Sequence, residues 1–295
     1  MSYNSPMLDS RSIYKARVDA AIMFITEHLA EDLSLEDIAE AAHFSSFHFH
    51  RIFSAMVGET PQQFLNRVRL ERAANYLVKN PAHCITQIAL ACGFSSPATF
   101  ARSFKKHFGI SANEYRKVTD KPMSSGILPP KDDGELPEST VEIRNVPAWN
   151  LIYVSNLKGY RLELIQQAWN QLYRWASARD LVTESTRAIG VSLDDPLITP
   201  AEKCRYYACL SLPDEIVPQP PIGFMKLAGS KCVVAHVTCA AEQIRGVFMY
   251  LYRDWLVDSG YQPADLPPYE VYEPNPETTP VGQYTLDICI PIVPL

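Results

Sequence analysis

Residues 38–58 read IAEAAHFSSFHFHRIFSAMVG, and residues 88–109 read IALACGFSSPATFARSFKKHFG. Both stretches contain an Ile-Ala pair, a Phe-Ser-Ser turn, an Arg-x-Phe step and a closing glycine. Small residues where two helices cross, with a short turn between the helices, are typical of a helix-turn-helix unit. Two copies at this separation predict that the first part of the chain is all-α and holds two such units in tandem.

Sequence signals also mark where the helices of this region begin. Ser34 can cap a helix that starts at Leu35, and the stretches 60–63 and 111–114 both have the spacing of a capping box. An apolar stripe predicts a single helix over residues 61–79, which would be about 28 Å long. A helix of that length would hold the two units close to one DNA turn apart, about 34 Å.

In such units the second helix enters the major groove of DNA, so its outward side chains are candidate base contacts. In the first unit Phe49, Ile52 and Phe53 are spaced to face the core, and Arg51 can donate two hydrogen bonds to a guanine. In the second unit Phe100 and Phe104 are expected inside, which leaves Arg102 as the main donor outside. The predicted DNA-contacting residues are Phe47, His48, His50, Arg51, Ser96, Pro97, Ala98, Ala101 and Arg102, with Lys105, Lys106, Arg116 and Lys117 available for phosphates.

A plainer interpretation stays open for the individual side chains, because aromatic and histidine residues on a helix also occur as core residues beside a solvated face. A metal site built from His43, His48 and His50 is not expected. His48 and His50 point to different faces of the helix, and no cysteine or carboxylate completes a tetrahedral set.

Composition and charge fit two domains with different partners. Of the 295 residues, 47% are hydrophobic and 20% charged, and no apolar run approaches the roughly 20 residues of a membrane helix. Because no signal peptide is visible and the seven cysteines form no CxxC pair, we expect a cytoplasmic protein with reduced thiols and no membrane partner. Residues 1–118 carry 13 Lys and Arg against 11 Asp and Glu, whereas residues 119–295 carry 14 against 22. This change of sign indicates two modules.

The second half contains another repeat, at a spacing of 79 to 80 residues, in which Trp169 corresponds to Phe248 and Cys209 to Cys289. Each copy reads as strand-strand-helix-strand-strand. We therefore expect an α+β domain over residues 139–295, with two pseudo-repeated units in one antiparallel sheet and both helices on one side. The strands are expected at 141–145, 150–157, 187–193, 205–212, 223–227, 231–238, 269–273 and 284–291, and the helices at 162–179 and 241–258. A linker at 119–138 would join this domain to the helix-turn-helix domain at 1–118.

A groove between the two repeats is a usual place for a ligand, and Glu270 is the informative residue there. Its repeat counterpart is Gly190, so only one copy carries the carboxylate. A glutamate among aromatic residues is costly to bury unless it is paired, and a cation framed by aromatic rings would supply the partner. An exposed strand edge, and a counter-ion role for Asp287 or Glu273 instead, remain open. The predicted ligand-binding residues are Glu270, Tyr153, Trp169, Phe248, Trp255 and Tyr272.

Both halves resemble known families. Residues 14–118 resemble the AraC/XylS-type DNA-binding domain through the paired Ile-Ala and Phe-Ser motifs and the Tyr115-Arg116 ending, although Cys84 stands where that family has a Ser or Thr helix cap. The resemblance implies a monomeric domain that lays two recognition helices into successive major grooves. Residues 139–295 resemble the GyrI-like effector-binding domain through Arg205-Tyr206 and the stretch 269–272, with Tyr207 in place of the usual aspartate. That resemblance implies an amphipathic, often cationic, small molecule bound around the glutamate.

These features predict a sequence-specific transcription regulator whose partners are double-stranded DNA, a small-molecule effector and RNA polymerase. No Ser/His/Asp, Cys/His or metal-ligand constellation is visible, so neither enzyme activity nor a cofactor is expected. Three alternatives remain: a C-terminal protein-interaction module without a small ligand, an enzyme with Glu270 as general base, and a non-specific nucleoid-type binder. The mild charge of residues 1–118 disfavours the last of these.

Overall fold

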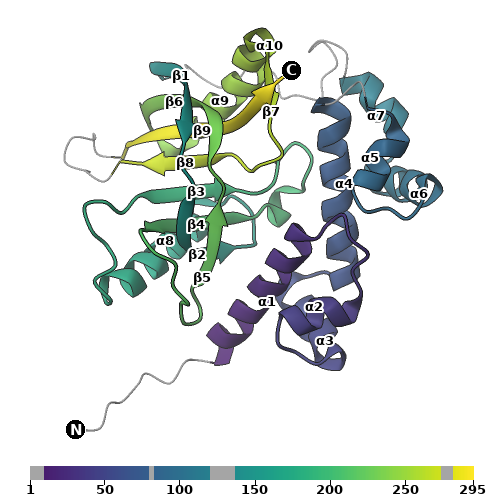
Figure 1. The fold of residues 1–295 in the computed structure, drawn as a ribbon, viewed down its shortest axis with the longest axis horizontal. Helices are drawn as coiled ribbons and strands as arrows, with labels where there is room; N and C mark the ends of the chain where they lie inside the picture. The colour runs from purple at the N-terminus through teal and green to yellow at the C-terminus, as the bar shows by residue number, and fades with distance from the viewer. Residues whose placement is uncertain (1–9, 80–82, 120–136, 274–281) are drawn as a thin grey trace. The chain divides into compact units, whose positions relative to one another are not determined.

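The computed structural model describes residues 10–79, 83–119, 137–273 and 282–295 (Figure 1). The chain divides into two compact units, one formed mainly by residues 1–128 and the other mainly by residues 129–295. The linker predicted at 119–138 falls almost entirely outside the described residues. Across the described ranges, no helix is both long enough and apolar enough to cross a membrane.

The first unit is all-α, as the sequence predicts. Helices α2 and α3 form the first helix-turn-helix pair and α5 and α6 the second, and α4 contacts helices of both pairs (Figure 1). The helix predicted at 61–79 is confirmed by α4. The helices are α1 (Ser10–Glu27), α2 (Leu35–Ala41), α3 (Ser46–Val57), α4 (Pro61–Lys79), α5 (Ile85–Ala91), α6 (Pro97–Phe108) and α7 (Ala112–Thr119).

Reciprocal hydrogen bonds between a side chain and the backbone fix where these helices begin. At α2 the Ser34 hydroxyl accepts from the Asp37 amide at 3.1 Å, while the Asp37 carboxylate accepts from the Ser34 amide at 2.9 Å. Cys84 makes the same arrangement at α5, with its sulfur 3.4 Å from the Gln87 amide nitrogen and its own amide 3.0 Å from Gln87 Oε1. A thiol therefore completes this cap, although sulfur is a weaker acceptor than a hydroxyl oxygen.

The second unit is a nine-stranded antiparallel sheet with helices, and each predicted strand has an observed counterpart. The helix expected at 241–258 is interrupted by a π-helical turn, and the short strand β7 was not predicted. The elements are β1 (Ser139–Val146), β2 (Trp149–Asn156), α8 (Leu162–Ser177), β3 (Ala188–Ser192), a 3-10 turn (Ala201–Lys203), β4 (Tyr206–Leu212), β5 (Gly223–Leu227), β6 (Ser230–Cys239), α9 (Ala241–Tyr250), the π turn (Leu251–Trp255), α10 (Leu256–Ser259), β7 (Tyr261–Pro263), β8 (Tyr269–Tyr272) and β9 (Tyr284–Pro294).

The strand order joins the two halves of this unit into one sheet. It runs β1-β6-β9-β8-β3-β4-β2-β5, with β7 beside β9. Strand β3 from the first half and β8 from the second pair directly at the centre. Strand β1, the first strand of the first half, pairs with β6 of the second half. Strand β5, the first strand of the second half, pairs with β2 of the first half. Each half therefore adds its first strand to the strands of the other half. The centre of the sheet is therefore the place where side chains from both halves meet.

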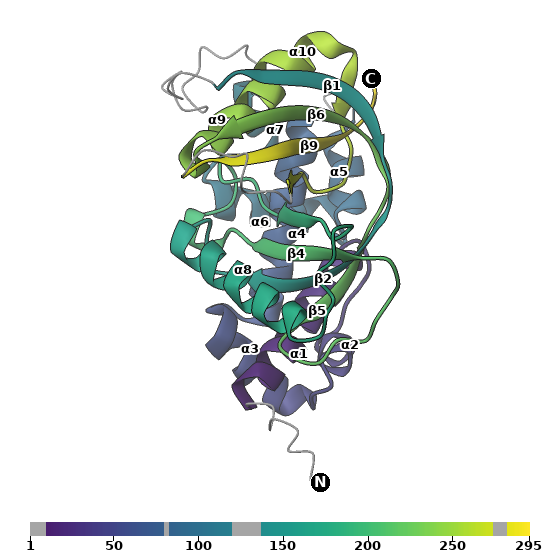
Figure 2. The same ribbon diagram turned by 90° about the vertical axis from the view of Figure 1, so that its left-hand side faces the viewer.

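The strand register shows that α8 and α9 cover the same face of the sheet (Figure 2). One row of paired residues crosses the central strands, namely Val154, Ala208, Gly190, Glu270, Ile288 and Ala235. Val154 and Ala208 belong to the core that packs under α8, whereas Ile288 and Ala235 belong to the core that packs under α9. Since paired residues share a face, Glu270 lies on the helix-covered face between the two cores.

Candidate functional site

Helices α3 and α6, which the sequence predicts as recognition helices, bury their phenylalanines and expose most of the predicted outer residues. On α3, Phe49 and Phe53 are fully buried, while His48, His50 and Arg51 are exposed. The Phe47 side chain is outside the part of the structure that is described. On α6, Phe100 and Phe104 are fully buried, and the exposed residues are Pro97, Ala98, Ala101 and Arg102.

Two residues of these helices differ from the sequence expectation. Ser96 was expected on the outer face, but it is half-buried, and its hydroxyl accepts from the Thr99 amide at 3.2 Å. The Ser96 side chain is therefore engaged in starting α6 rather than directed outward. Ile52 was expected in the core but is only half-buried.

In the second unit Glu270 is buried on β8, with 6% of its surface exposed. The Tyr272 hydroxyl donates to Glu270 Oε2 at 2.7 Å, and the Tyr206 hydroxyl lies 3.4 Å from the same oxygen. Among the described residues the partners of Glu270 are thus two phenols and no cation. The plain alternative of an exposed strand edge does not hold for Glu270, because the residue is in a central strand.

Gly190 faces Glu270 directly across the β3–β8 pair, so the two residues that correspond in the sequence repeat are neighbours in space. A Cβ atom on residue 190 would overlap the Tyr206 hydroxyl and lie 2.7 Å from Glu270 Oε2. Glycine is therefore required here, because it leaves the space in which the carboxylate and the Tyr206 hydroxyl meet.

Burial raises the pKa of Glu270 from its ordinary value of 4.5 to about 7, against the opposing effect of the two tyrosine hydrogen bonds. Burial, and then the negative charge of Glu270, also raise the pKa values of Tyr206 and Tyr272. Both phenols consequently remain protonated donors. Glu270 itself is poised between its neutral and charged forms near neutral pH.

This pKa predicts how stability changes with pH. The folded state binds the Glu270 proton more tightly than the unfolded state does, so this proton stabilises the fold. Its contribution to the free energy of unfolding is fully present below about pH 4.5 and is lost as the pH rises through about 7. Gln does not titrate, so Glu270→Gln should gain stability relative to wild type over this window, by up to about 3 kcal/mol. The measurement is urea unfolding by tryptophan fluorescence, because all four tryptophans (Trp149, Trp169, Trp175 and Trp255) belong to this unit.

The exposed Glu163 provides the matched control for that experiment, since Glu163→Gln removes the same charge from the surface of α8. The stability difference between Glu163→Gln and wild type should not follow the Glu270→Gln curve. A pH-independent difference between Glu270→Gln and wild type would contradict the raised pKa.

Aromatic rings connect Glu270 to the surface. Trp169 of α8 stands edge-on to Tyr272, with ring centroids 5.8 Å apart. Tyr173, which is 39% exposed, contacts Trp169 at 5.9 Å, and Tyr284, which is 38% exposed, contacts Tyr272 at 6.0 Å. We call Glu270, Tyr206, Tyr272 and Trp169 the Glu270 cluster. Phe248 and Trp255 are half-buried on the α9 side and pack against the core that also contacts Tyr272.

Tyr153 does not join the Glu270 cluster, contrary to the sequence expectation. Its neighbours Ile152 and Val154 both belong to the core under α8, so Tyr153 points to the opposite face of the sheet. There its ring stacks on Tyr207 at 4.6 Å with an interplanar angle of 3°. Tyr206, which the sequence-based set of ligand residues lacked, takes its place beside Glu270.

The other two candidate counter-ions also lie away from Glu270. Asp287 pairs with Val271 and His236 in the sheet, which places it on the opposite face from Glu270. Its carboxylate is 2.9 Å from His236 Nδ1 and also bonds Arg144. Glu273 lies 3.9 Å from His236 Nε2. Both acids therefore have basic neighbours, whereas Glu270 has only phenols among its described partners. No group of three or more His, Cys, Asp or Glu in the described ranges could hold a metal ion.

The chain therefore contains two tandem helix-turn-helix pairs in one unit and a sheet domain with a buried carboxylate in the other. Residues 139–293 match the family described as GyrI-like small molecule binding domain, and residues 27–118 match a helix-turn-helix domain family. The first match covers more than half of the chain. The chain belongs to the GyrI-like family, and its residues 27–118 form a helix-turn-helix domain.

Relatives with known names match the helix-turn-helix region. An uncharacterized HTH-type transcriptional regulator of Haemophilus influenzae is 37% identical over 101 residues, which is 34% of each chain. The HTH-type transcriptional activator RhaS of Escherichia fergusonii is 36% identical over 105 residues, covering 36% of this chain and 37% of RhaS. The chain thus spans only about a third of the length of these relatives.

Solved structures match each half separately. An AraC-type DNA-binding protein from Chromobacterium violaceum is 32% identical, with a TM-score of 0.34, covering 36% of this chain and 94% of its own. The C-terminal domain of EcmrR is 13% identical, with a TM-score of 0.44, covering 53% of this chain and 99% of its own.

Proposed function

We propose that residues 1–118 bind duplex DNA sequence-specifically and that residues 139–295 bind an amphipathic cation at the Glu270 cluster, with residues 119–138 as the linker. The observation that carries the ligand class is the buried Glu270 carboxylate, whose described partners are two phenols. Phe248 and Trp255 would contact the ligand from the α9 side. RNA polymerase is a further proposed partner, since a DNA-bound regulator acts on transcription through it.

The electrostatics of a buried carboxylate favour a cation over a neutral ligand. An ionised carboxylate out of water is costly unless an opposite charge accompanies it, and the pKa of about 7 reflects that cost. A lipophilic cation would supply the charge, while its apolar groups contact the faces of Trp169 and Tyr272. Both rings are half-buried, so the ligand would reach Glu270 by displacing one of them.

We infer that the two halves of the sheet domain act as pseudo-repeats about the central β3–β8 pair. The exchange of β1 and β5 between the halves supports this, as does the direct pairing of Gly190 with Glu270. A ligand at this pair would touch strands from both halves. Such a ligand would bind more tightly to one arrangement of the two halves than to another. A difference in affinity between two conformations is what a ligand-operated switch requires.

The experiment that tests ligand binding is thermal unfolding of the full chain, followed by tryptophan fluorescence, with increasing methyltriphenylphosphonium. A ligand that binds only the folded state raises the Tm as its concentration rises. We expect such a rise with this cation and a smaller one with neutral triphenylphosphine oxide. A Tm unaffected by a panel of lipophilic cations, in a protein that still binds DNA, would favour the alternative of a protein-interaction module.

The DNA-binding half of the proposal predicts a dominant role for Arg51. Arg51→Ala should weaken binding to the selected DNA site by about 1–3 kcal/mol and relax the base preference at one position, because a bidentate contact is lost. Arg102→Ala is the matched variant in the second unit, whose exposed face offers few other long donors. It should cost less specificity, since that unit would read mainly DNA shape and phosphates. Equal losses of specificity in the two variants would refute the asymmetry.

A further inference from the structure

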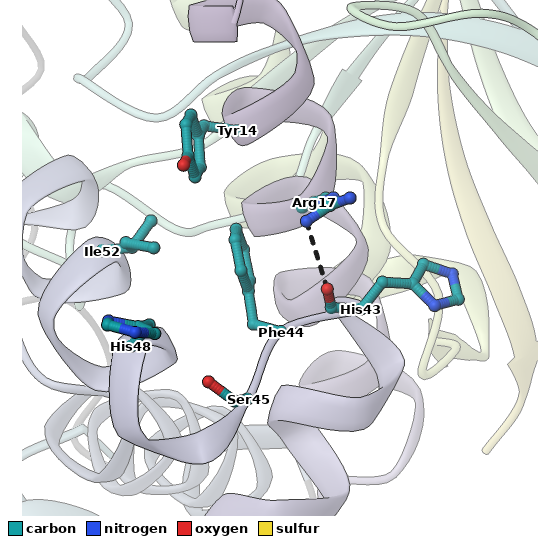
Figure 3. A pocket seen from close by; sticks show the side chains of 7 residues that line it. All are labelled: Tyr14, Arg17, His43, Phe44, Ser45, His48 and Ile52. Atoms are coloured by element: carbon teal, nitrogen blue, oxygen red, sulfur yellow. Dashed lines mark hydrogen bonds between the residues drawn. The ribbon is translucent and has the colours of Figure 1, made fainter.

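A pocket of about 360 Å³ lies between α1 and α3 in the helical unit (Figure 3). Tyr14 and Arg17 of α1 form one side, and His48 and Ile52 of α3 form the other. The turn residues 43–45 complete the lining, with the Phe44 ring between the two helices. Arg17 comes from a helix outside both helix-turn-helix pairs, and His48 and Ile52 are on the first recognition helix.

The aromatic rings of the pocket hold the Arg17 guanidinium in place. The Tyr14 and Phe44 rings stack at 5.7 Å with an interplanar angle of 8°, and the guanidinium carbon of Arg17 is 5.1 Å from the Phe44 centroid. One N–H of Arg17 donates to the His43 carbonyl at 3.2 Å. Since a guanidinium has five N–H donors in a planar fork, this contact orients the group and leaves donors for a ligand.

The lining favours an anion. None of its seven residues is acidic, although the chain as a whole has a net charge of −6. Ser45 is exposed, and its hydroxyl makes no capping hydrogen bond to α3. An arginine, a histidine and a hydroxyl therefore surround an apolar floor formed by Phe44 and Ile52. This combination suits a phosphodiester, whose charged oxygens would meet the donors while its sugar lies on the rings.

We propose that this pocket seats one phosphate of the DNA backbone, with Arg17 as its main contact, when α3 lies in the major groove. His48 precedes the exposed Arg51 by one helical turn on α3, so a ligand at the pocket lies beside the face assigned to base contacts. His48, predicted above as a base contact, is reassigned to the backbone. Arg69 lies beside the turn of the second helix-turn-helix pair, close to Gly93, but it donates to the carbonyls of Leu29 and Glu31. Arg69 is therefore not placed to make the contact that we assign to Arg17.

The inference rests on the proposed DNA-binding function, and its test uses the full chain with the duplex that the chain selects from a random-sequence pool. Arg17→Gln removes the charge but keeps a donor for the His43 carbonyl, and Arg17→Lys keeps the charge. Arg11→Gln removes the same charge from an exposed site on the same helix, outside the pocket. The readouts are the slope of log Kd against log salt and interference by phosphate ethylation, with circular dichroism to confirm that each variant is folded.

Arg17→Gln should lower the magnitude of the salt slope by about 0.9 and abolish ethylation interference at one phosphate, without changing the preferred sequence. Arg17→Lys and Arg11→Gln should keep both signals. An unchanged slope in folded Arg17→Gln would overturn the inference alone, whereas a chain that selects no duplex would contradict the DNA-binding function itself. A rise in Tm of the DNA-free protein with inorganic phosphate, lost in Arg17→Gln, would assign the pocket to a free anion and also overturn the inference.

Discussion

Glu270→Gln should weaken the binding of a lipophilic cation by about 2–5 kcal/mol, or roughly 30-fold to 4,000-fold, at a pH where wild-type Glu270 is ionised. The reason is that the variant keeps the size and hydrogen-bonding shape of the side chain but removes the only charge in the Glu270 cluster. The bound cation would then sit between Trp169 and Tyr272 without a counter-ion, and its desolvation would be uncompensated. Isothermal titration with methyltriphenylphosphonium at about pH 8.5 measures the effect.

Two controls separate the charge from other effects of this substitution. Triphenylphosphine oxide, a neutral ligand of similar size, should bind the variant about as well as wild type or better. Asp287→Asn removes an acid on the opposite face of the sheet and should leave cation affinity unchanged. Full cation affinity in Glu270→Gln, with a loss in Asp287→Asn, would move the counter-ion to the His236 side of the sheet.

Arg205→Ala should lower the stability of the sheet unit by about 3–5 kcal/mol, because it leaves a buried carboxylate without its cation. The Arg205 guanidinium donates from Nε to Asp194 Oδ2 at 2.8 Å and from its terminal nitrogen to Oδ1 at 2.7 Å. Both side chains are only 4% exposed. The Tyr160 hydroxyl also bonds the Asp194 backbone, so this pair fixes the chain between β3 and β4. Urea unfolding by tryptophan fluorescence measures the loss.

The exposed pair Arg161–Glu163 offers the comparison for this variant. Its side chains are 68% and 72% exposed, so Arg161→Ala should cost less than about 1 kcal/mol. The double variant Arg205→Met with Asp194→Leu should recover much of the loss, because it removes both buried charges together. If Arg205→Ala lowered the free energy of unfolding as little as Arg161→Ala does, the buried Arg205–Asp194 pair would not be stabilising this region.

The elements of the fold were predictable because local signals determine them. The capping residues at 34, 60 and 111 and the apolar stripe of residues 61–79 all act within a few positions in the chain, and the structure has helices at these places. The positions of the strands were likewise predicted from local signals in the sequence. The order of the strands was not predicted, since the pairing of β1 with β6 and of β5 with β2 depends on contacts between segments far apart in sequence.

The composition of the ligand site was predictable only in part. Glu270, Trp169 and Tyr272 were identified because an acid beside aromatic residues is unusual. Tyr153 was assigned to the wrong face because six consecutive residues at the end of β2 are buried, so no alternation of polar and apolar residues shows which way each one points. Tyr206 was missed because its contact with Glu270 joins residues that are 64 positions apart.

The measurement that tests the central claim most directly is proton release on cation binding. If Glu270 has a pKa of about 7 and becomes the counter-ion, a bound cation must displace its proton at low pH. Calorimetry of methyltriphenylphosphonium binding in two buffers with different ionisation enthalpies should therefore show release of about 0.9 proton at pH 6, about half a proton at pH 7 and almost none at pH 8.5. Triphenylphosphine oxide, and the cation with Glu270→Gln, should release none. Cation binding to wild type at pH 6 without proton release would contradict the assignment of Glu270 as the counter-ion.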